Sequence, residues 1–459
     1  MQCRDTDKLV GGDLPQRRRL DYGSVPKGAA RDAADASKLS GAQLALAVSL
    51  TVVNLCHGLP SRCVALFFPK AADERDVGET WVGATFGTFH AVYFVASFVA
   101  GAAVARYGGK KVLTCGYCLL GASFMAYGWC LRFVNSGATF VPLAMLLRGL
   151  EAVGATSATV GVYAVVTKEL VHHRGTVIIA LNAAYTLGLA LGSVVGSALF
   201  AVGGFLLPFI ALGAALLCAA ALLVWLVGRT QTEASKPQRE EGWNACALLL
   251  KRVPWMLVLV GADFSCSMAV VFVDLTLEPL LRRFELSTMA VGCLFMLPPL
   301  TFAAAAYGTG RLADRPGWAV VVNSCATLAA GLSLLGFAAS AAAVDVHCLV
   351  WAMLLTVASL MVHGFSEANF GVVFTSCFEF AAAFGVSNPE VGFATLHNAA
   401  LSSGGFVGSI VGGTIVEQAG IPCAMIAIAT PIFIAEMGLL SYLIRRRRLL
   451  VLPDWNSDF

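Results

Sequence analysis

The feature that most constrains the fold of this chain is a long run without charge. It extends from Thr176 to Gly228, 53 residues without Asp, Glu, Lys or Arg. The hydrocarbon core of a membrane is about 30 Å thick, and about 20 helical residues cross it. Two spans therefore fit into this one run, and Gly203 and Gly204 mark the turn between them.

Apolar stretches elsewhere predict ten further spans. Eight have no Asp, Glu, Lys or Arg: 39–61, 80–105, 112–131, 287–310, 318–344, 346–366, 391–416 and 418–435. Two contain charge, namely 140–166 and 254–277. Backbone polar groups find no partners in lipid, so each span should be a helix. With 58% hydrophobic and 13% charged residues, the chain is expected to be an all-α membrane protein with twelve transmembrane helices.

Motifs that recur at constant distances indicate two related halves. Val82-Gly83 and Val291-Gly292 open the second and eighth spans, 209 residues apart. In the fifth and eleventh spans, motifs of glycines at four-residue spacing begin at Gly188 and Gly404, which are 216 residues apart. The predicted organisation is a cytosolic tail (1–38), a six-helix bundle (39–228), a cytosolic linker (229–253), a second six-helix bundle (254–444) and a basic tail (445–459).

Glycines at four-residue spacing lie on one helix face and let another helix approach closely. Because the motifs recur in both halves, we expect them at a moving interface between the halves. The residues expected in gating and helix packing are Gly188, Gly192, Ser193, Gly196, Gly404, Gly408, Ser409 and Gly412, with Arg106, Asp314 and Arg315 in the loops that follow the second and eighth spans.

The distribution of Lys and Arg predicts the orientation. The side that carries the two termini has 24 of them, and the opposite loops have 6, among which Arg62 is counted. Basic residues prefer the cytosolic side, so both termini should be cytosolic. The sequence leaves open whether the membrane is the plasma membrane or that of a vesicle.

Ionisable side chains inside spans are candidates for function because each costs about 2.5 kcal/mol or more to insert. Arg148 and Glu151 share a helix face near mid-membrane and can pair. Asp263 is expected near mid-membrane on the seventh span, as the acid that meets a cationic substrate. Further candidates for substrate binding or proton coupling lie on the fifth, seventh and tenth spans: Asn182, Tyr185, Asp274, Glu278, His363 and Glu367.

Several of these residues carry a family resemblance. Gly310 to Gly317 reads Gly-x-x-x-Asp-Arg-x-Gly, and 148–154 reads Arg-Gly-Leu-Glu-Ala-Val-Gly. Both are similar to motifs of the major facilitator superfamily. The segments 67–71, 80–89, 203–209 and 277–287 resemble the vesicular amine and polyamine transporters within it. The resemblance implies a secondary transporter, an antiporter that exchanges protons for an amine.

The sequence also departs from the family pattern. Ala105 stands where the superfamily loop has Asp, Ser193 and Ser409 stand where antiporters usually have Pro, and Asn182 stands where the amine group commonly has an acid. Coupling to protons is therefore left open.

Three functions remain as alternatives. The first is an alternating-access carrier of an organic cation or amine, and the second is a carrier of a monocarboxylate or other organic anion with Arg148 as its counter-charge. The third is a membrane receptor or scaffold that transports nothing. The expected partners are a small-molecule substrate, protons and the lipid bilayer, with no nucleic acid, cofactor or metal, and the protein should act as a monomer. No nucleophile-and-base cluster and no phosphate-binding loop is visible in the sequence, so an enzyme and an ATP-driven pump are not expected.

Overall fold

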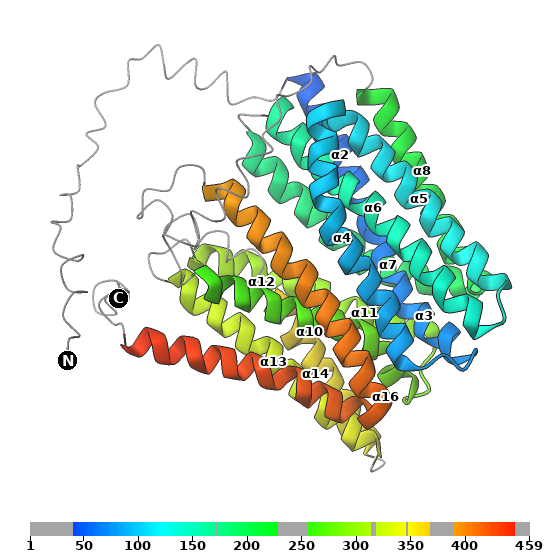
Figure 1. Ribbon diagram of the computed structural model, residues 1–459, viewed down its shortest axis with the longest axis vertical. Coiled ribbons are helices and arrows are strands. Elements are labelled where there is room, and N and C mark those ends of the chain that lie inside the picture. Colours follow the sequence, from blue (N-terminus) through cyan, green and yellow to red (C-terminus); the bar gives the residue numbers. More distant parts are fainter. Residues whose placement is uncertain are drawn as a thin grey trace, which may run out of the picture.

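The computed structural model describes residues 40–170, 173–227, 256–313, 318–345, 348–367 and 389–445, and its regular structure there is helical (Figure 1). The first group of helices comprises α2 (Gly41–Ser61), α3 (Cys63–Asp73), α4 (Glu79–Tyr107), α5 (Gly109–Phe133), α6 (Gly137–Glu169), α7 (Arg174–Gly203) and α8 (Leu206–Val227). The second comprises α10 (Met256–Arg282), α11 (Thr288–Phe295), α12 (Leu297–Ala313), α13 (Trp318–Asp345), α14 (Leu349–Glu367) and α16 (Pro389–Arg445). Asp314, Arg315, the linker 229–253 and both predicted tails lie outside the described residues, apart from Arg445.

The described helices account for the expected twelve spans. Eleven are long and apolar enough to cross a membrane, with α2 and α3 forming one of them and α11 and α12 another. The last, α16, has 57 residues and is interrupted by Gly420, whose φ of 81° is not helical. The chain turns back at Gly420, so α16 contains two spans, and the prediction of an all-α fold with twelve transmembrane helices is confirmed.

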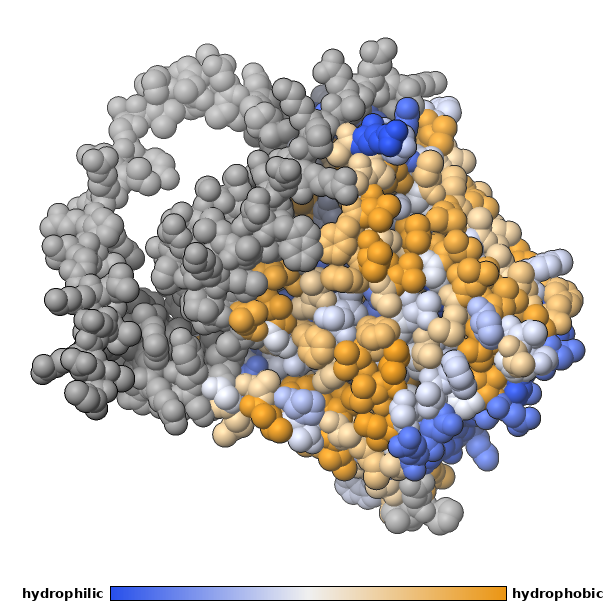
Figure 2. Space-filling view, in the orientation of Figure 1, coloured by the Kyte–Doolittle hydropathy of each residue, from blue (hydrophilic) through white to orange (hydrophobic). Residues whose placement is uncertain are grey.

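The surface of the helices is largely apolar, as a lipid environment requires (Figure 2). Large exposed side chains such as Val95, Val99, Ile179 and Leu354 lie along the spans. Hydrophilic side chains gather at the helix ends, including the end where α3 and α4 meet.

Helices pack mainly within two halves, α2–α8 and α10–α16. The halves meet through α4 against α16, α7 against α11 and α12, and α3 against α10. Figure 1 shows these contacts near the end where α3 passes to α4, and the ribbons diverge towards the end where α2 begins. We call the end where α2 begins the terminal side and the opposite end the distal side.

The two halves are related by an approximate two-fold axis that can be located. Asp73 and Arg282 are 209 residues apart, the spacing of the repeat, and their side chains form an ion pair of 2.6 Å. Equivalent residues contact each other only where a two-fold axis passes between them. Asp76 and Glu285, also 209 apart, both have positive φ, 54° and 53°. The repeat read from the sequence is therefore present in the backbone.

Candidate transport site between the halves

The centre of the contact between the halves holds a buried ion network. Arg62, where α2 passes into α3, pairs with Asp274 of α10 and lies 3.5 Å from Glu367 of α14. Arg62 and Glu367 are buried, and the side chain of Asp274 is 21% exposed. One guanidinium from the first half thus holds two carboxylates of the second.

The structure corrects the placement of Arg62, which was counted among the loop residues. The backbone remains helical at Arg62, with φ −89° and ψ −14°, and α3 continues the span to Asp73. Cys63 to Phe68 is apolar and contains no turn residue, a signal that the span extends beyond Arg62. The tertiary contacts with α10 and α14 then give this arginine its role.

The predicted pair of Arg148 and Glu151 is present on α6. Nη1 of Arg148 lies 2.7 Å from Oε2 of Glu151, and both side chains are buried. The guanidinium also lies over the ring of Phe89 of α4, 4.3 Å from its centroid. Carboxylate and aromatic face together compensate the charge of Arg148.

Tyr185 of α7 connects these two groups. Its hydroxyl lies near the side chain of Ser61 and within electrostatic range of Arg62, Glu367 and Glu151. Its ring packs edge-on against His57 of α2, with centroids 5.4 Å apart. The predicted site residues Tyr185, Glu151, Asp274 and Glu367 are therefore brought together.

The described residues of this central group carry a net negative charge. In their ordinary ionised forms, Arg62 and Arg148 oppose Glu151, Asp274 and Glu367, which leaves one acid in excess. Glu151 and Asp274 each pair closely with one arginine. Glu367, whose closest arginine contact is longer, is therefore the surplus acid.

Asp263 lies elsewhere, inside the second half. Its Oδ2 is 2.7 Å from Nδ1 of His397 of α16, and the carboxylate is 0% exposed. We expected Asp263 to meet a substrate cation, but in this conformation it is sealed between helices of one half. Its partner His397 could not be assigned from the sequence because the two residues are 134 positions apart.

Three further predicted residues have contacts that were not predicted for them. Nδ1 of His363 lies 3.2 Å from the hydroxyl of Ser333. Asn182 accepts a hydrogen bond from the hydroxyl of Tyr163 at 3.2 Å. Glu278 binds Arg282 at the distal side, with distances of 3.0 and 2.7 Å.

The six glycines expected between the halves pack within them instead, whereas Gly413, next to Gly412, faces the backbone of α4 in the other half. A Cβ at Gly188 or Gly192 would overlap backbone atoms of α2, and one at Gly196 would lie 2.8 Å from Sγ of Cys63. In the second half, Gly404 and Gly408 face the backbone of α10, and Gly412 faces the ring of Phe272. These helices therefore pack closely against helices of their own half.

The backbone carbonyls of the serines in the same motifs, Ser193 and Ser409, do face the other half. A Cβ at Gly83 of α4 would overlap the carbonyl of Ser409, and one at Gly292 of α11 would lie 2.7 Å from the carbonyl of Ser193. Gly83 and Gly292 are equivalent in the repeat. The same close contact between a glycine and the carbonyl of a serine therefore occurs at two equivalent places between the halves. Both lie on the distal side of the central network.

The predicted loop residues are described only in part. Arg106 is exposed at the end of α4, 5.3 Å from the ring centroid of its neighbour Tyr107. Asp314 and Arg315 lie outside the described residues.

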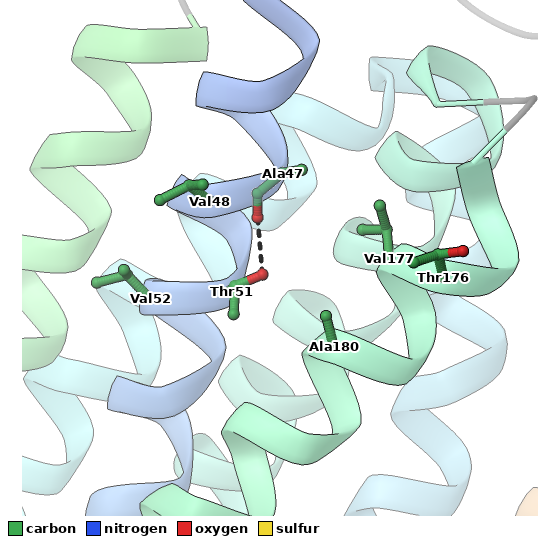
Figure 3. A pocket seen from close by; sticks show the side chains of 7 residues that line it. All are labelled: Ala47, Val48, Thr51, Val52, Thr176, Val177 and Ala180. Atoms are coloured by element: carbon green, nitrogen blue, oxygen red, sulfur yellow. Dashed lines mark hydrogen bonds between the residues drawn. The ribbon is translucent and has the colours of Figure 1, made fainter. Parts of the chain in front are cut away.

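A separate apolar pocket of about 280 Å³ lies between α2 and α7 near the terminal side (Figure 3). Its lining has no charged side chain, and its hydroxyl on α2, that of Thr51, donates to the carbonyl of Ala47 at 2.8 Å. The lining residues are Ala47, Val48, Thr51, Val52, Thr176, Val177 and Ala180. This pocket has no group that could compensate a charged substrate, so we do not include it in the site.

Comparison with known proteins agrees with this architecture. Residues 50–388 match the family model described as Major Facilitator Superfamily. The chain belongs to the major facilitator superfamily. By family and fold it is a transporter and not an enzyme.

Curated relatives have the name MFS-type transporter SLC18B1. The Mus musculus protein is 28% identical over 409 residues, covering 87% of this chain and 85% of the relative. The Homo sapiens protein is 27% identical over 419 residues, covering 89% and 88%. The resemblance to the vesicular amine-like solute carriers is thereby confirmed.

Solved structures share the fold at low sequence identity. A bacterial homologue of the human lysosomal transporter Spinster, in an inward-facing and unoccupied conformation, has a TM-score of 0.67 at 13% identity, covering 87% of this chain and 96% of that one. The nucleoside transporter NupG has a TM-score of 0.63 at 14% identity, covering 88% and 99%.

Proposed function

We propose that this superfamily member is a secondary active transporter that works by alternating access and moves an organic cation such as an amine. The observation that carries the proposal is the surplus carboxylate of Glu367 in the buried central network. A buried charge without a full partner is costly, so this site favours an additional cation. An ammonium group beside Glu367 would bring the net charge of the group to zero.

The division of the charges between the halves supports alternating access. Asp274 and Glu367 belong to the second half, and Arg62, Glu151 and Tyr185 belong to the first. A substrate bound among them contacts both halves, and its binding energy can therefore bias the way in which they meet.

The same geometry disfavours the anion carrier. Arg148 and Arg62 both contact carboxylates, and Arg148 also lies over an aromatic ring. A monocarboxylate would have to displace one of these partners and would add to a net negative charge.

Coupling to protons is proposed on a separate observation, the sealed pair of Asp263 and His397. An additional proton on this pair would cancel the buried negative charge of Asp263, which is costly to leave uncompensated. Asp263 and Asp274 are eleven residues apart on α10, about three turns. A change in how α10 is held at Asp263 can therefore move the acid that holds Arg62.

Counterflow of labelled amines and monocarboxylates into proteoliposomes tests the proposal. Glu367→Gln keeps the size of the side chain and removes its charge, so amine counterflow should fall by about 10- to 100-fold, the equivalent of one charge-assisted hydrogen bond. Glu169→Gln, which breaks the ion pair with Lys110 in the first half, is the matched control and should retain transport. Undiminished amine counterflow in Glu367→Gln would overturn the cation site. Monocarboxylate transport that is lost in Arg148→Gln would establish the anion carrier instead.

A further inference from the structure

Equivalent helices of the two halves begin differently on the distal side. Ser287 is the N-cap of α11, and its hydroxyl accepts a hydrogen bond from the backbone N–H of Ala290 at 3.3 Å. Gly78, 209 residues earlier, is the N-cap of α4 and has no side chain that could do the same. The first N–H groups of a helix have no partners within it, so α4 needs an acceptor from elsewhere.

The acceptor comes from the other half of the protein. Oε2 of Glu417 on α16 accepts the backbone N–H of Thr80 at 2.8 Å, the second residue of α4. This is one of the positions that an N-cap side chain normally bonds. A Cβ at Gly78 would lie 2.7 Å from the same carboxylate oxygen, so the glycine makes room for it.

The contact is made on one side of the two-fold axis only. The residue equivalent to Glu417, 216 positions earlier, is Ala201, which has no acceptor in its side chain. In the second half the cap is supplied locally by Ser287, whereas in the first half it is supplied across the interface.

We propose that Glu417 is a latch of the distal gate, a positioning residue that holds the halves together on that side by capping α4. Gly83, one turn after Thr80, contacts the carbonyl of Ser409, so opening there must pull α4 away from α16. The cap is then lost, and the N–H of Thr80 is left to water instead of the carboxylate. The latch therefore raises the population of the state closed on the distal side.

Other charged groups surround the latch. Asp73 of α3, Glu278 and Arg282 of α10, and Glu417 itself each lie within electrostatic range of Glu79 at the start of α4. Asp73 and Arg282 form a second link between the halves beside it. Loss of Glu417 should therefore lower the population of the state that is closed on the distal side without abolishing that state.

The test measures how often the distal side opens, and it requires no substrate. Ile410 of α16 packs against Gly87 of α4, so Ile410→Cys places a thiol in the closed interface. The rate of modification at position 410 by a membrane-impermeant maleimide applied from the distal side is followed by peptide mass spectrometry. Glu417→Ala should raise this rate about 5-fold, which corresponds to the usual loss of about 1 kcal/mol for a helix cap. Glu417→Gln keeps an acceptor and should raise it less.

The double variant Glu417→Ala with Gly78→Ser separates a latch from simple helix stabilisation. Gly78→Ser gives α4 a cap of its own, as Ser287 gives α11, but does not restore the link to α16. If Glu417 is a latch, the double variant continues to react faster than the parent. A return to the parent rate, or no acceleration in Glu417→Ala, would overturn the proposal. The latch rests on the alternating access proposed above, but loss of amine transport in Glu367→Gln has no bearing on this labelling, so the two can fail separately.

Discussion

Arg62 holds two carboxylates of the opposite half in a buried position, and its removal should be among the most damaging single changes. Arg62→Gln leaves Asp274 and Glu367 without their cation, and breaking a buried ion pair costs about 3–5 kcal/mol. We expect a large loss of thermal stability in detergent, and partial recovery in the double variant with Asp274→Asn. Arg106→Gln is the control because Arg106 is exposed, and it should change stability by no more than about 0.5 kcal/mol. Equal melting temperatures for Arg62→Gln and the control would contradict the buried network.

Asp263 and His397 should govern the coupling rather than the binding of substrate. Asp263→Asn keeps the shape of the buried pair and removes its charge. Counterflow, which needs no pH gradient, should be retained, whereas uptake driven by a pH gradient should fall about 10-fold or more, because the proton-accepting pair is lost. His397→Gln should give the same separation. Loss of counterflow together with gradient-driven uptake would instead assign Asp263 to the substrate site or to folding.

At the scale of helices, replacement of a glycine should affect either stability or closure, according to whether the glycine faces a helix of its own half or of the other half. Gly192 packs against α2 of its own half, so Gly192→Ala should lower the melting temperature of the protein through overlap with the backbone of Leu59. Gly83 packs against Ser409 of the other half, so Gly83→Ala should leave each half folded and block closure on the distal side.

Melting temperature and transport, measured together, distinguish the two effects. Gly101→Ala is the control because a Cβ there meets nothing within 4 Å, and helix propensity favours alanine. A melting temperature of Gly83→Ala as low as that of Gly192→Ala would show that the two interfaces are not independent.

At the scale of the whole molecule, the orientation in the membrane remains a prediction with a direct test. With Arg62 placed inside the bundle, the count of Lys and Arg becomes 24 on the terminal side and 5 on the distal side. We expect a tag at either terminus to be protected in intact cells and to react after permeabilisation. A terminal tag that reacts from outside would reverse the topology, and the distal latch would then face the cytosol.

The sequence by itself determined the number of spans and the existence of the repeat. Charge-free runs of sufficient length have no other stable place than a membrane, where backbone polar groups must pair within helices. The pairing of Arg148 with Glu151 was equally predictable, because residues three apart on a helix always share a face.

Only the tertiary structure decided which residues from distant helices meet. The contact of Asp263 with His397 joins positions 134 residues apart, and that of Glu417 with Thr80 joins positions 337 apart, far beyond any helical periodicity. The partners of the glycine motifs depended in the same way on helix rotation, since a glycine ridge fits a helix of its own half as well as one of the other half. Spacing along a chain fixes the face of a helix on which a residue lies, whereas packing fixes what that face contacts.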